Sequence, residues 1–224
     1  DRHTYVPIIG LFCALVFGAY EFSCESKKAK TAFIACLATL FLFWSALTWQ
    51  QVQYWRDSVS LFSRAAAVTR QNYVTANNLG FAHLLRGELD KAEKWLEIAV
   101  KLDQWYPPSL DNMGLLKRKL GKPKEAELWA LRAISRSPQK AGAHSNLGMA
   151  LLAQGRLEAA RKSFQTALAL DEGLANAHFQ LGLMAAKEQK MTDAISHFEK
   201  TVALAPEFAQ GHNNLGVLLA QQGH

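Results

Sequence analysis

Two sets of polar side chains recur at equal spacing in the second half of the sequence. In the first set, histidines stand 34 residues apart, at His144, His178 and His212. A metal ion needs its ligands about 2 Å away, whereas equivalent sites on stacked helices lie on the order of 10 Å apart. We therefore expect these histidines to be packing positions that accept an imidazole, and we predict no metal site.

The second set is a ladder of side-chain amides with the same spacing of 34 residues. Each amide stands directly before the Leu or Met that precedes a Gly, and the members are Asn78, Asn112, Asn146, Gln180 and Asn214. A side-chain amide both donates and accepts hydrogen bonds, so such a ladder can pair with the backbone of an extended polypeptide without reading its sequence. The alternative is a structural role, in which each amide bonds to an adjacent repeat or to the backbone. The sequence leaves both interpretations open.

The remaining sequence contains no pattern typical of a catalytic site. There is no Ser/His/Asp arrangement, no pair of carboxylates in a pocket context and no glycine-rich phosphate loop. The cysteines, Cys13, Cys24 and Cys36, form no CxxC motif. The 224 residues carry a net charge of +6 without any run of five basic residues, so nucleic acid is not an expected partner. No catalytic residue, metal ligand or cofactor is predicted within this chain.

The ladder is positioned by repeated pairs of helices. Short segments such as NNLG and SNLG recur every 34 residues, and their last residues are Gly80, Gly114, Gly148, Gly182 and Gly216. In each unit a first helix carries this glycine, which lets a second helix approach closely. The second helix carries a small Ala and then a large apolar residue. One unit cannot bury its apolar face alone, so stacked units bury it jointly.

The repeat boundaries follow from the spacing. Four full units are predicted at 73–106, 107–140, 141–174 and 175–208, with a partial fifth unit at 209–224. The second unit has Lys117 and Ala130 where larger apolar groups are usual, which predicts looser packing. The partial unit leaves the apolar face of Leu215 and Leu219 without a second helix, so further repeats or a cap are expected.

The period, together with the Leu, Gly, Ala, aromatic and Pro positions, resembles the tetratricopeptide repeat family over residues 73–224. The resemblance implies an all-α solenoid, a right-handed superhelix that binds polypeptide on its concave face. The amide ladder is similar to the asparagine ladder in the repeats of the nucleocytoplasmic O-GlcNAc transferase, which holds extended polypeptide. This similarity applies to the four Asn positions and is weaker at Gln180.

Residues 1–50 are predicted to form a transmembrane hairpin, with spans at about 6–22 and 31–49. Residues 6–20 and 31–49 contain no charge, and at about 1.5 Å per residue the second span reaches across a bilayer core. The alternative is a pair of buried helices in a soluble domain, although such helices usually show a polar stripe. Small residues at helical spacing on both spans indicate packing against each other or against further transmembrane helices.

The charges around the spans predict an orientation. The connector holds Lys27, Lys28 and Lys30, which places it inside by the positive-inside rule. Both ends of the chain are then extracytoplasmic, in a bacterial periplasm or the ER lumen. Residues 51–72 are predicted as an adaptor helix that resembles the second helix of a repeat, with Phe62 and Ala65 in phase. The second span would then stand in for the first helix of that unit.

The first residues resemble a junction found in membrane glycosyltransferase-like proteins of the O-mannosyltransferase superfamily with appended tetratricopeptide repeats. The matching residues are Asp1, Arg2, Thr4, Tyr5 and Pro7, with His3 where an aromatic residue is commoner. The resemblance implies a polyprenyl- or dolichyl-phosphate sugar donor and acidic catalytic residues in an early loop that this chain does not contain. Asp1 and Arg2 would lie near a lipid phosphate or, more simply, anchor the interface.

Two functions remain after this comparison. The first is a membrane-tethered scaffold that presents polypeptide to a glycosyltransferase core encoded upstream. The second is a membrane-anchored adaptor for extracytoplasmic complex assembly, with no enzyme attached. In both, the function of this chain is binding, and its expected partners are a polypeptide and the lipid bilayer.

Overall fold

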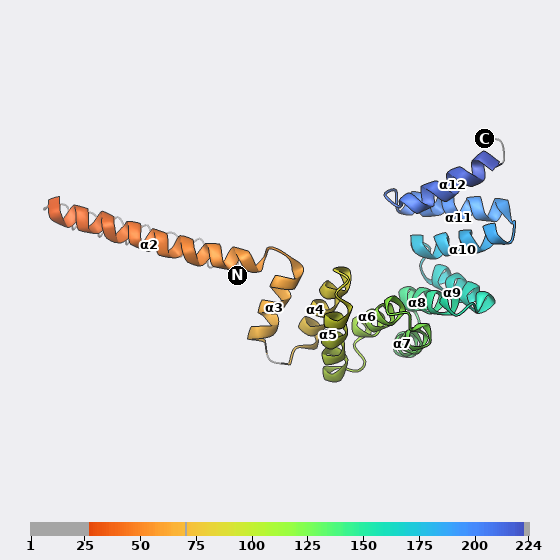
Figure 1. Cartoon of the computed structure of the whole chain (residues 1–224), viewed down its shortest axis with the longest axis horizontal. Coiled ribbons are helices and arrows are strands. Elements are labelled where there is room, and N and C mark those ends of the chain that lie inside the picture. Colours follow the sequence, from red (N-terminus) through yellow and green to blue (C-terminus); the bar gives the residue numbers. More distant parts are fainter. Residues whose placement is uncertain (1–26, 70, 222–224) are drawn as a thin grey trace. The chain divides into compact units, whose positions relative to one another are not determined.

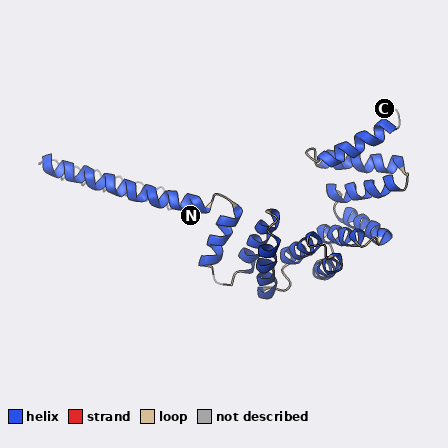
Figure 2. Cartoon of the chain, in the orientation of Figure 1, coloured by secondary structure: helices blue, strands red, loops and turns tan. Residues whose placement is uncertain are grey.

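The computed structural model describes residues 27–69 and 71–221, and these residues form helices without a strand (Figures 1 and 2). The chain divides into two compact units, residues 1–61 and 62–224. The first predicted span, at 6–22, lies outside the described residues.

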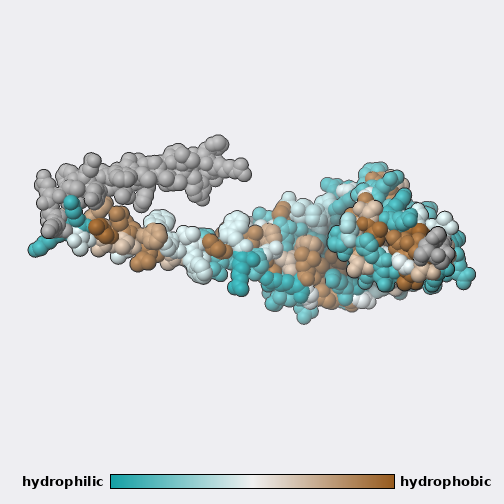
Figure 3. Space-filling model, turned by 90° about the horizontal axis from the view of Figure 1, so that it is seen from above, coloured by the Kyte–Doolittle hydropathy of each residue, from teal (hydrophilic) through white to brown (hydrophobic). Residues whose placement is uncertain are grey.

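The N-terminal unit contains the long helix α2, Lys27–Tyr54. Its 28 residues extend roughly 42 Å at 1.5 Å per residue, which exceeds the roughly 30 Å hydrocarbon core of a bilayer. Among the described helices, only this one is long and apolar enough to cross a membrane. Large apolar side chains such as Phe41 and Trp49 are exposed on it. Figure 3 shows hydrophobic residues at the surface of this helix. The second predicted span, at 31–49, lies inside this longer helix.

A short helix, α3 (Ser58–Val68), begins with a side-chain cap. The Asp57 carboxylate accepts a hydrogen bond of 2.9 Å from the backbone N–H of Ser60, as expected at a helix N-terminus. The helix lies within the predicted adaptor at 51–72, and Phe62 and Ala65 are half-buried. The predicted boundaries at 50 and 72, and the role of the second span as a first helix, stay predictions.

The larger unit contains four helix pairs and a ninth helix. Every first helix begins at the first residue of a predicted repeat. The helices are α4 (Tyr73–Leu85), α5 (Leu89–Leu102), α6 (Pro107–Lys119), α7 (Pro123–Arg136), α8 (Ala141–Ala153), α9 (Leu157–Leu170), α10 (Ala175–Lys187), α11 (Met191–Leu204) and α12 (Ala209–Gln221). Each first helix packs against the second helix of its own repeat, and each second helix packs against the next first helix (Figure 1). The predicted all-α repeat solenoid is confirmed.

The close approach of paired helices occurs at the predicted glycines. A Cβ added at Gly148 would lie 2.7 Å from the Phe164 ring, and one added at Gly182 would lie 2.8 Å from the Phe198 ring. Both phenylalanines are fully buried. A glycine on the first helix therefore makes room for the large apolar residue of the second.

The first helices of repeats one to four end in the same chain reversal. A residue in the left-handed region follows each of them, at Gly87, Gly121 and Gly155 with φ of 75°, 70° and 75°. Gln189 adopts the same conformation in the fourth repeat, with φ of 61°. The next residue then donates its N–H back into the helix, as Arg156 does to the Leu151 carbonyl at 3.0 Å. This is the hydrogen bond of a Schellman-type cap.

The second repeat is packed more loosely at its glycine. A Cβ at Gly114 would meet nothing closer than 3.7 Å, because Ala130 stands where other repeats carry Leu or Phe. Lys117 is nevertheless buried, with its ammonium 2.7 Å from Glu93 and 3.0 Å from Glu125. The expected looser packing is found where α6 contacts α7 at Gly114. At the position of Lys117, an ion triad with Glu93 and Glu125 replaces the usual large apolar side chain.

Candidate functional site

All members of the amide ladder lie on first helices and are half-buried. They occupy α4, α6, α8, α10 and α12 in order, at Asn78, Asn112, Asn146, Gln180 and Asn214. We call the surface formed by these positions the first-helix groove. The 34-residue period therefore places one amide per repeat along a single surface of the solenoid.

The two N-terminal amides are held by a third that the sequence analysis missed. Asn77 is 3% exposed. Its side-chain N–H donates to Asn78 Oδ1 at 3.2 Å, and its Oδ1 accepts from Asn112 Nδ2 at 2.9 Å. This chain of amides ties repeat one to repeat two, so at this end of the ladder the geometry favours the structural alternative.

The three C-terminal amides differ from these two. Asn146, Gln180 and Asn214 make no side-chain hydrogen bond to any residue that the structure describes. They are half-buried and keep both donors and acceptors available. The groove of repeats three to five can therefore bond to a ligand without breaking contacts of its own.

Two cavities lie beside these free amides, on either side of Leu183. One has a volume of about 380 Å³ and includes Gln180, Leu152 and Met184 in its lining. The other has a volume of about 550 Å³ and includes Phe179 and Asn214. Each cavity thus combines one ladder amide with apolar walls, which is the usual composition of a ligand site.

An apolar column runs beside the ladder. Three residues after each amide, on the same helix face, stand Phe81, Leu115, Met149, Leu183 and Val217. Leu183 is 38% exposed and Val217 48% exposed. This column was not predicted, although the same 34-residue spacing marks it in the sequence. The amides can hydrogen-bond to the backbone of an extended polypeptide, and the apolar column can pack against its side chains.

The rim of the groove is basic. Arg118, Lys119 and Lys187 stand at or near the C-terminal ends of first helices. None of these three has a carboxylate of a described residue within 4 Å. Lys187 also lines the cavity beside Gln180. Uncompensated cations at this rim favour a ligand that carries carboxylates.

The histidine ladder has a specific structural role. The ring Nε2 of His144 lies 2.8 Å from the Pro138 carbonyl, that of His178 lies 3.2 Å from the Glu172 carbonyl, and that of His212 lies 2.9 Å from the Pro206 carbonyl. A carbonyl only accepts, so each Nε2 carries the hydrogen and donates it. Each imidazole therefore hydrogen-bonds to the turn that precedes its own helix. This bond gives the expected packing role a specific form. Within 27–69 and 71–221, no three His, Cys, Asp or Glu side chains gather as metal ligands do.

Ion pairs join neighbouring repeats at one recurring place. A charged residue near the start of the second helix contacts the next repeat in the first three repeats, in the pairs Glu93 with Lys117, Glu127 with Arg156, and Arg161 with Glu188. Burial alone would lower the pKa of Lys117, but the hydrogen bonds of its ammonium with Glu93 and Glu125 raise that pKa above its usual value. The hydrogen bond from Gln154 and the bond from Arg156 lower the pKa of the Glu127 carboxyl. These contacts fix neighbouring repeats and are not free for ligand chemistry.

Known protein families account for the repeated part of the chain. Two family models, both described as tetratricopeptide repeat, match the chain, one at residues 112–175 and 179–224 and the other at residues 74–97. No curated protein matches the chain significantly. The matched residues cover most of the larger unit, including every member of the amide ladder.

Solved structures show the same fold. A chain of the APC/C hetero-tetramer Cut9–Hcn1 is 22% identical with a TM-score of 0.64, over 72% of this chain and 32% of that one. This chain thus spans about a third of the length of that protein. The tetratricopeptide repeat protein TTC0263 of Thermus thermophilus is 18% identical with a TM-score of 0.63, over 72% and 89%. PilF of Pseudomonas aeruginosa is 22% identical with a TM-score of 0.61, over 67% and 68%. The repeated helix pairs of this chain are tetratricopeptide repeats, and the chain belongs to that family.

Proposed function

We propose that this chain is a membrane-anchored interaction scaffold that holds an extended polypeptide in the first-helix groove of repeats three to five. The observation that carries the proposal is the set of unbonded amides at Asn146, Gln180 and Asn214, beside the two cavities that flank Leu183. Tetratricopeptide repeats provide a protein-interaction fold, and these residues indicate where on it a partner would bind.

The mechanism is binding without chemistry. The amides would hydrogen-bond to the backbone of the partner, which makes recognition independent of its sequence. The cavities would take alternate side chains of the extended segment, since successive side chains point to opposite sides. The basic rim at Lys187 and Lys119 would favour partners with acidic residues. The expected partner is an extended segment with apolar side chains and nearby carboxylates.

A peptide-display library tests this proposal. Peptides would be selected on the full chain in detergent and compared on a variant with Asn146→Ala, Gln180→Ala and Asn214→Ala. A net hydrogen bond is worth about 1 kcal/mol, so losing three should weaken binding roughly 100-fold. The matched control is Asn78→Ala, which removes an amide already bonded to Asn77 and should leave peptide affinity unchanged. Equal affinity for the triple variant, with an unchanged melting temperature, would rule out the amide groove.

Membrane anchoring is a further part of the proposal. It is supported by the length and composition of α2 and by the charge pattern of the predicted connector. In the proposed orientation the repeats are extracytoplasmic, in a periplasm or the ER lumen. The small-residue faces of the predicted spans would pack against further transmembrane helices.

The link to a glycosyltransferase is supported only by the junction residues Asp1, Arg2, Thr4, Tyr5 and Pro7. On this proposal the scaffold would present polypeptide to a catalytic core that uses a polyprenyl-phosphate sugar donor and lies before Asp1. The coding sequence upstream decides the matter. Several additional spans with an acidic pair in an early outer loop would support the link, whereas a start codon directly before Asp1 would exclude it.

The second candidate is an assembly adaptor with no enzyme attached. The observation in its favour is that the family models match the repeats alone, so nothing outside the binding module is needed. Both candidates share the groove, and the peptide-binding experiment applies equally to them.

A further inference from the structure

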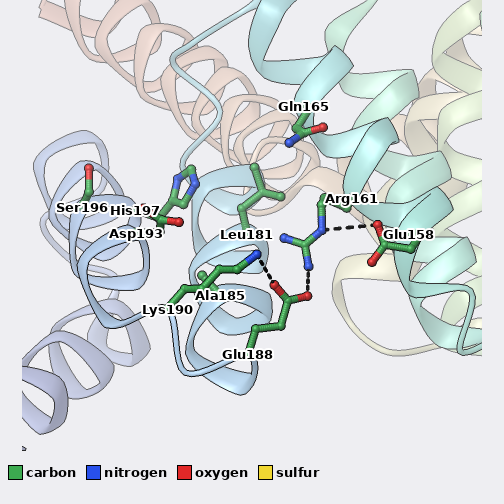
Figure 4. Close-up of a pocket in the computed structure, with 10 residues that line it drawn as sticks. All are labelled: Glu158, Arg161, Gln165, Leu181, Ala185, Glu188, Lys190, Asp193, Ser196 and His197. Atoms are coloured by element: carbon green, nitrogen blue, oxygen red, sulfur yellow. Dashed lines mark hydrogen bonds and ion pairs between the residues drawn. The ribbon is translucent and has the colours of Figure 1, made fainter.

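A third cavity, of about 440 Å³, lies between the second helices of repeats three and four. Residues of α9 and α11 form its walls, and Leu181 and Ala185 of α10 form part of its lining (Figure 4). Its size falls within the usual range of ligand sites, about 300–1,000 Å³. It is separate from the ladder, since no ladder amide lines it.

The cavity exists because one repeat position changes size. That position is His83, Lys117 and Leu151 in the first three repeats and Ala185 in the fourth, and all four residues are buried. The large side chains in the first three repeats fill the space beneath the second helices. The methyl group of Ala185 is smaller than these side chains, and it lines the cavity.

A pair of histidines fixes the hydrogen-bonding character of one wall. The Nδ1 atoms of His178 and His197 are 3.1 Å apart. His178 uses its Nε2–H for the Glu172 carbonyl, so its neutral ring has only a lone pair on Nδ1. The hydrogen between the rings therefore belongs to Nδ1 of His197, whose Nε2 is left as an acceptor. His197 lines the cavity.

The charged groups of the lining leave one carboxylate available and pair the cations. Arg161 is paired with Glu188 and lies 3.8 Å from Glu158, and Lys190 lies 2.9 Å from Glu188 (Figure 4). The Asp193 carboxylate has no described partner. The two cations of the lining thus face three carboxylates, and the one left without a cation stands one helical turn from His197.

We propose that this cavity receives the basic side chain of a protein partner, and that an arginine fits it best. A guanidinium offers five N–H donors in one plane and carries a fixed positive charge. The Asp193 carboxylate would take the charge, and Nε2 of His197 would accept one hydrogen. The stem of the side chain would pack on Leu181 and Ala185. The site shares Arg161 and Glu188 with the cavity beside Gln180, but it does not require the proposed function.

The test uses Nα-acetyl-L-arginine amide as the probe and the full chain in detergent micelles. The imidazole resonances of His197, followed by NMR during titration, should shift saturably. Nα-acetyl-L-citrulline amide has nearly the same shape but no charge, and it should bind at least tenfold more weakly. The ladder triple variant should bind the arginine probe normally, which separates this site from the groove.

Two variants act on residues that line this cavity alone. Asp193→Asn should weaken the arginine probe at least tenfold, and Ala185→Leu should abolish its binding by restoring the large side chain present at Leu151. Glu199→Gln, on α11 but outside the cavity, is the charge control and should have no effect. The proposal is overturned if the probe causes no saturable shift, if citrulline binds as tightly, or if binding survives in Asp193→Asn.

Discussion

Gly148 and Phe164 show how strictly single residues fit in this solenoid. A Cβ on Gly148 would lie within 2.9 Å of three atoms of the buried Phe164 ring, so the helices would have to separate. We expect Gly148→Ala to destabilise the protein by about 1–3 kcal/mol, the usual cost of overpacking. Urea unfolding followed by circular dichroism measures the change.

Gly114 provides the matched control for that substitution. Its nearest neighbours would be 3.7 Å from an added Cβ, so Gly114→Ala should be tolerated and should gain up to about 1 kcal/mol from helix propensity. Equal destabilisation by both substitutions would mean that the helix contact is not the cause.

The sequence predicted some of these contacts between single residues but not others. The glycine spacing correctly predicted the close helix contacts at Gly80, Gly148 and Gly182 but not the looser contact at Gly114, because the 34-residue period assigns the positions in contact and not the size of the facing residue. It did not predict that Asn77 would hold Asn78 and Asn112 while Asn146 stays unbonded. Asn77 has no amide counterpart in the later repeats except Asn213, so the period carried no signal for that bridge.

Helices α10 and α11 are joined by an interaction that depends on pH. Burial lowers the pKa of His178, and burial together with the nearby His178 lowers the pKa of His197. The folded state therefore binds fewer protons than the unfolded state, in which both values lie near 6.5. The contribution of this histidine pair to the free energy of unfolding is fully present above about pH 6.5. It is lost as the pH falls through the lowered folded-state pKa values. Lys200 and Arg161 add to the lowering for His197, while Asp193 opposes it.

The unfolding midpoint in urea should thus fall between pH 7.5 and pH 5. His197→Gln replaces one titrating ring with an amide that can still donate to His178, so this variant should show a smaller fall. An identical pH dependence in the variant would contradict a role for the pair. Acid-labile contacts elsewhere are common to both proteins and cancel in the comparison.

At this scale the sequence was most informative for the helices themselves. Each first helix begins where the repeat spacing places it, at Tyr73, Pro107, Ala141, Ala175 and Ala209. The ends of α2 were not predicted, because this helix extends beyond the predicted span at 31–49 to Tyr54. Hydropathy marks the apolar segment, whereas the flanking polar residues continue the helix without an apolar signal.

For the molecule as a whole, the anchor and its orientation can be tested by labelling. A variant with Cys13, Cys24 and Cys36 changed to Ser and Gln104 changed to Cys would be expressed in intact cells. An extracytoplasmic solenoid should react with an impermeant maleimide at residue 104 before lysis. Reaction only after lysis would place the repeats in the cytoplasm, and release of the protein by carbonate washing would contradict the anchor itself.

Polypeptide binding in the groove of repeats three to five can be tested by crosslinking. The most direct measurement places a photo-reactive residue at Leu183, between the two cavities, and irradiates the full chain with a display-selected peptide. A matched probe at Leu128, which is 62% exposed on the second helix α7, reports binding elsewhere. If the peptide lies in this groove, position 183 should form crosslinks that are lost in the ladder triple variant. Crosslinks from position 128 and none from position 183 would contradict it.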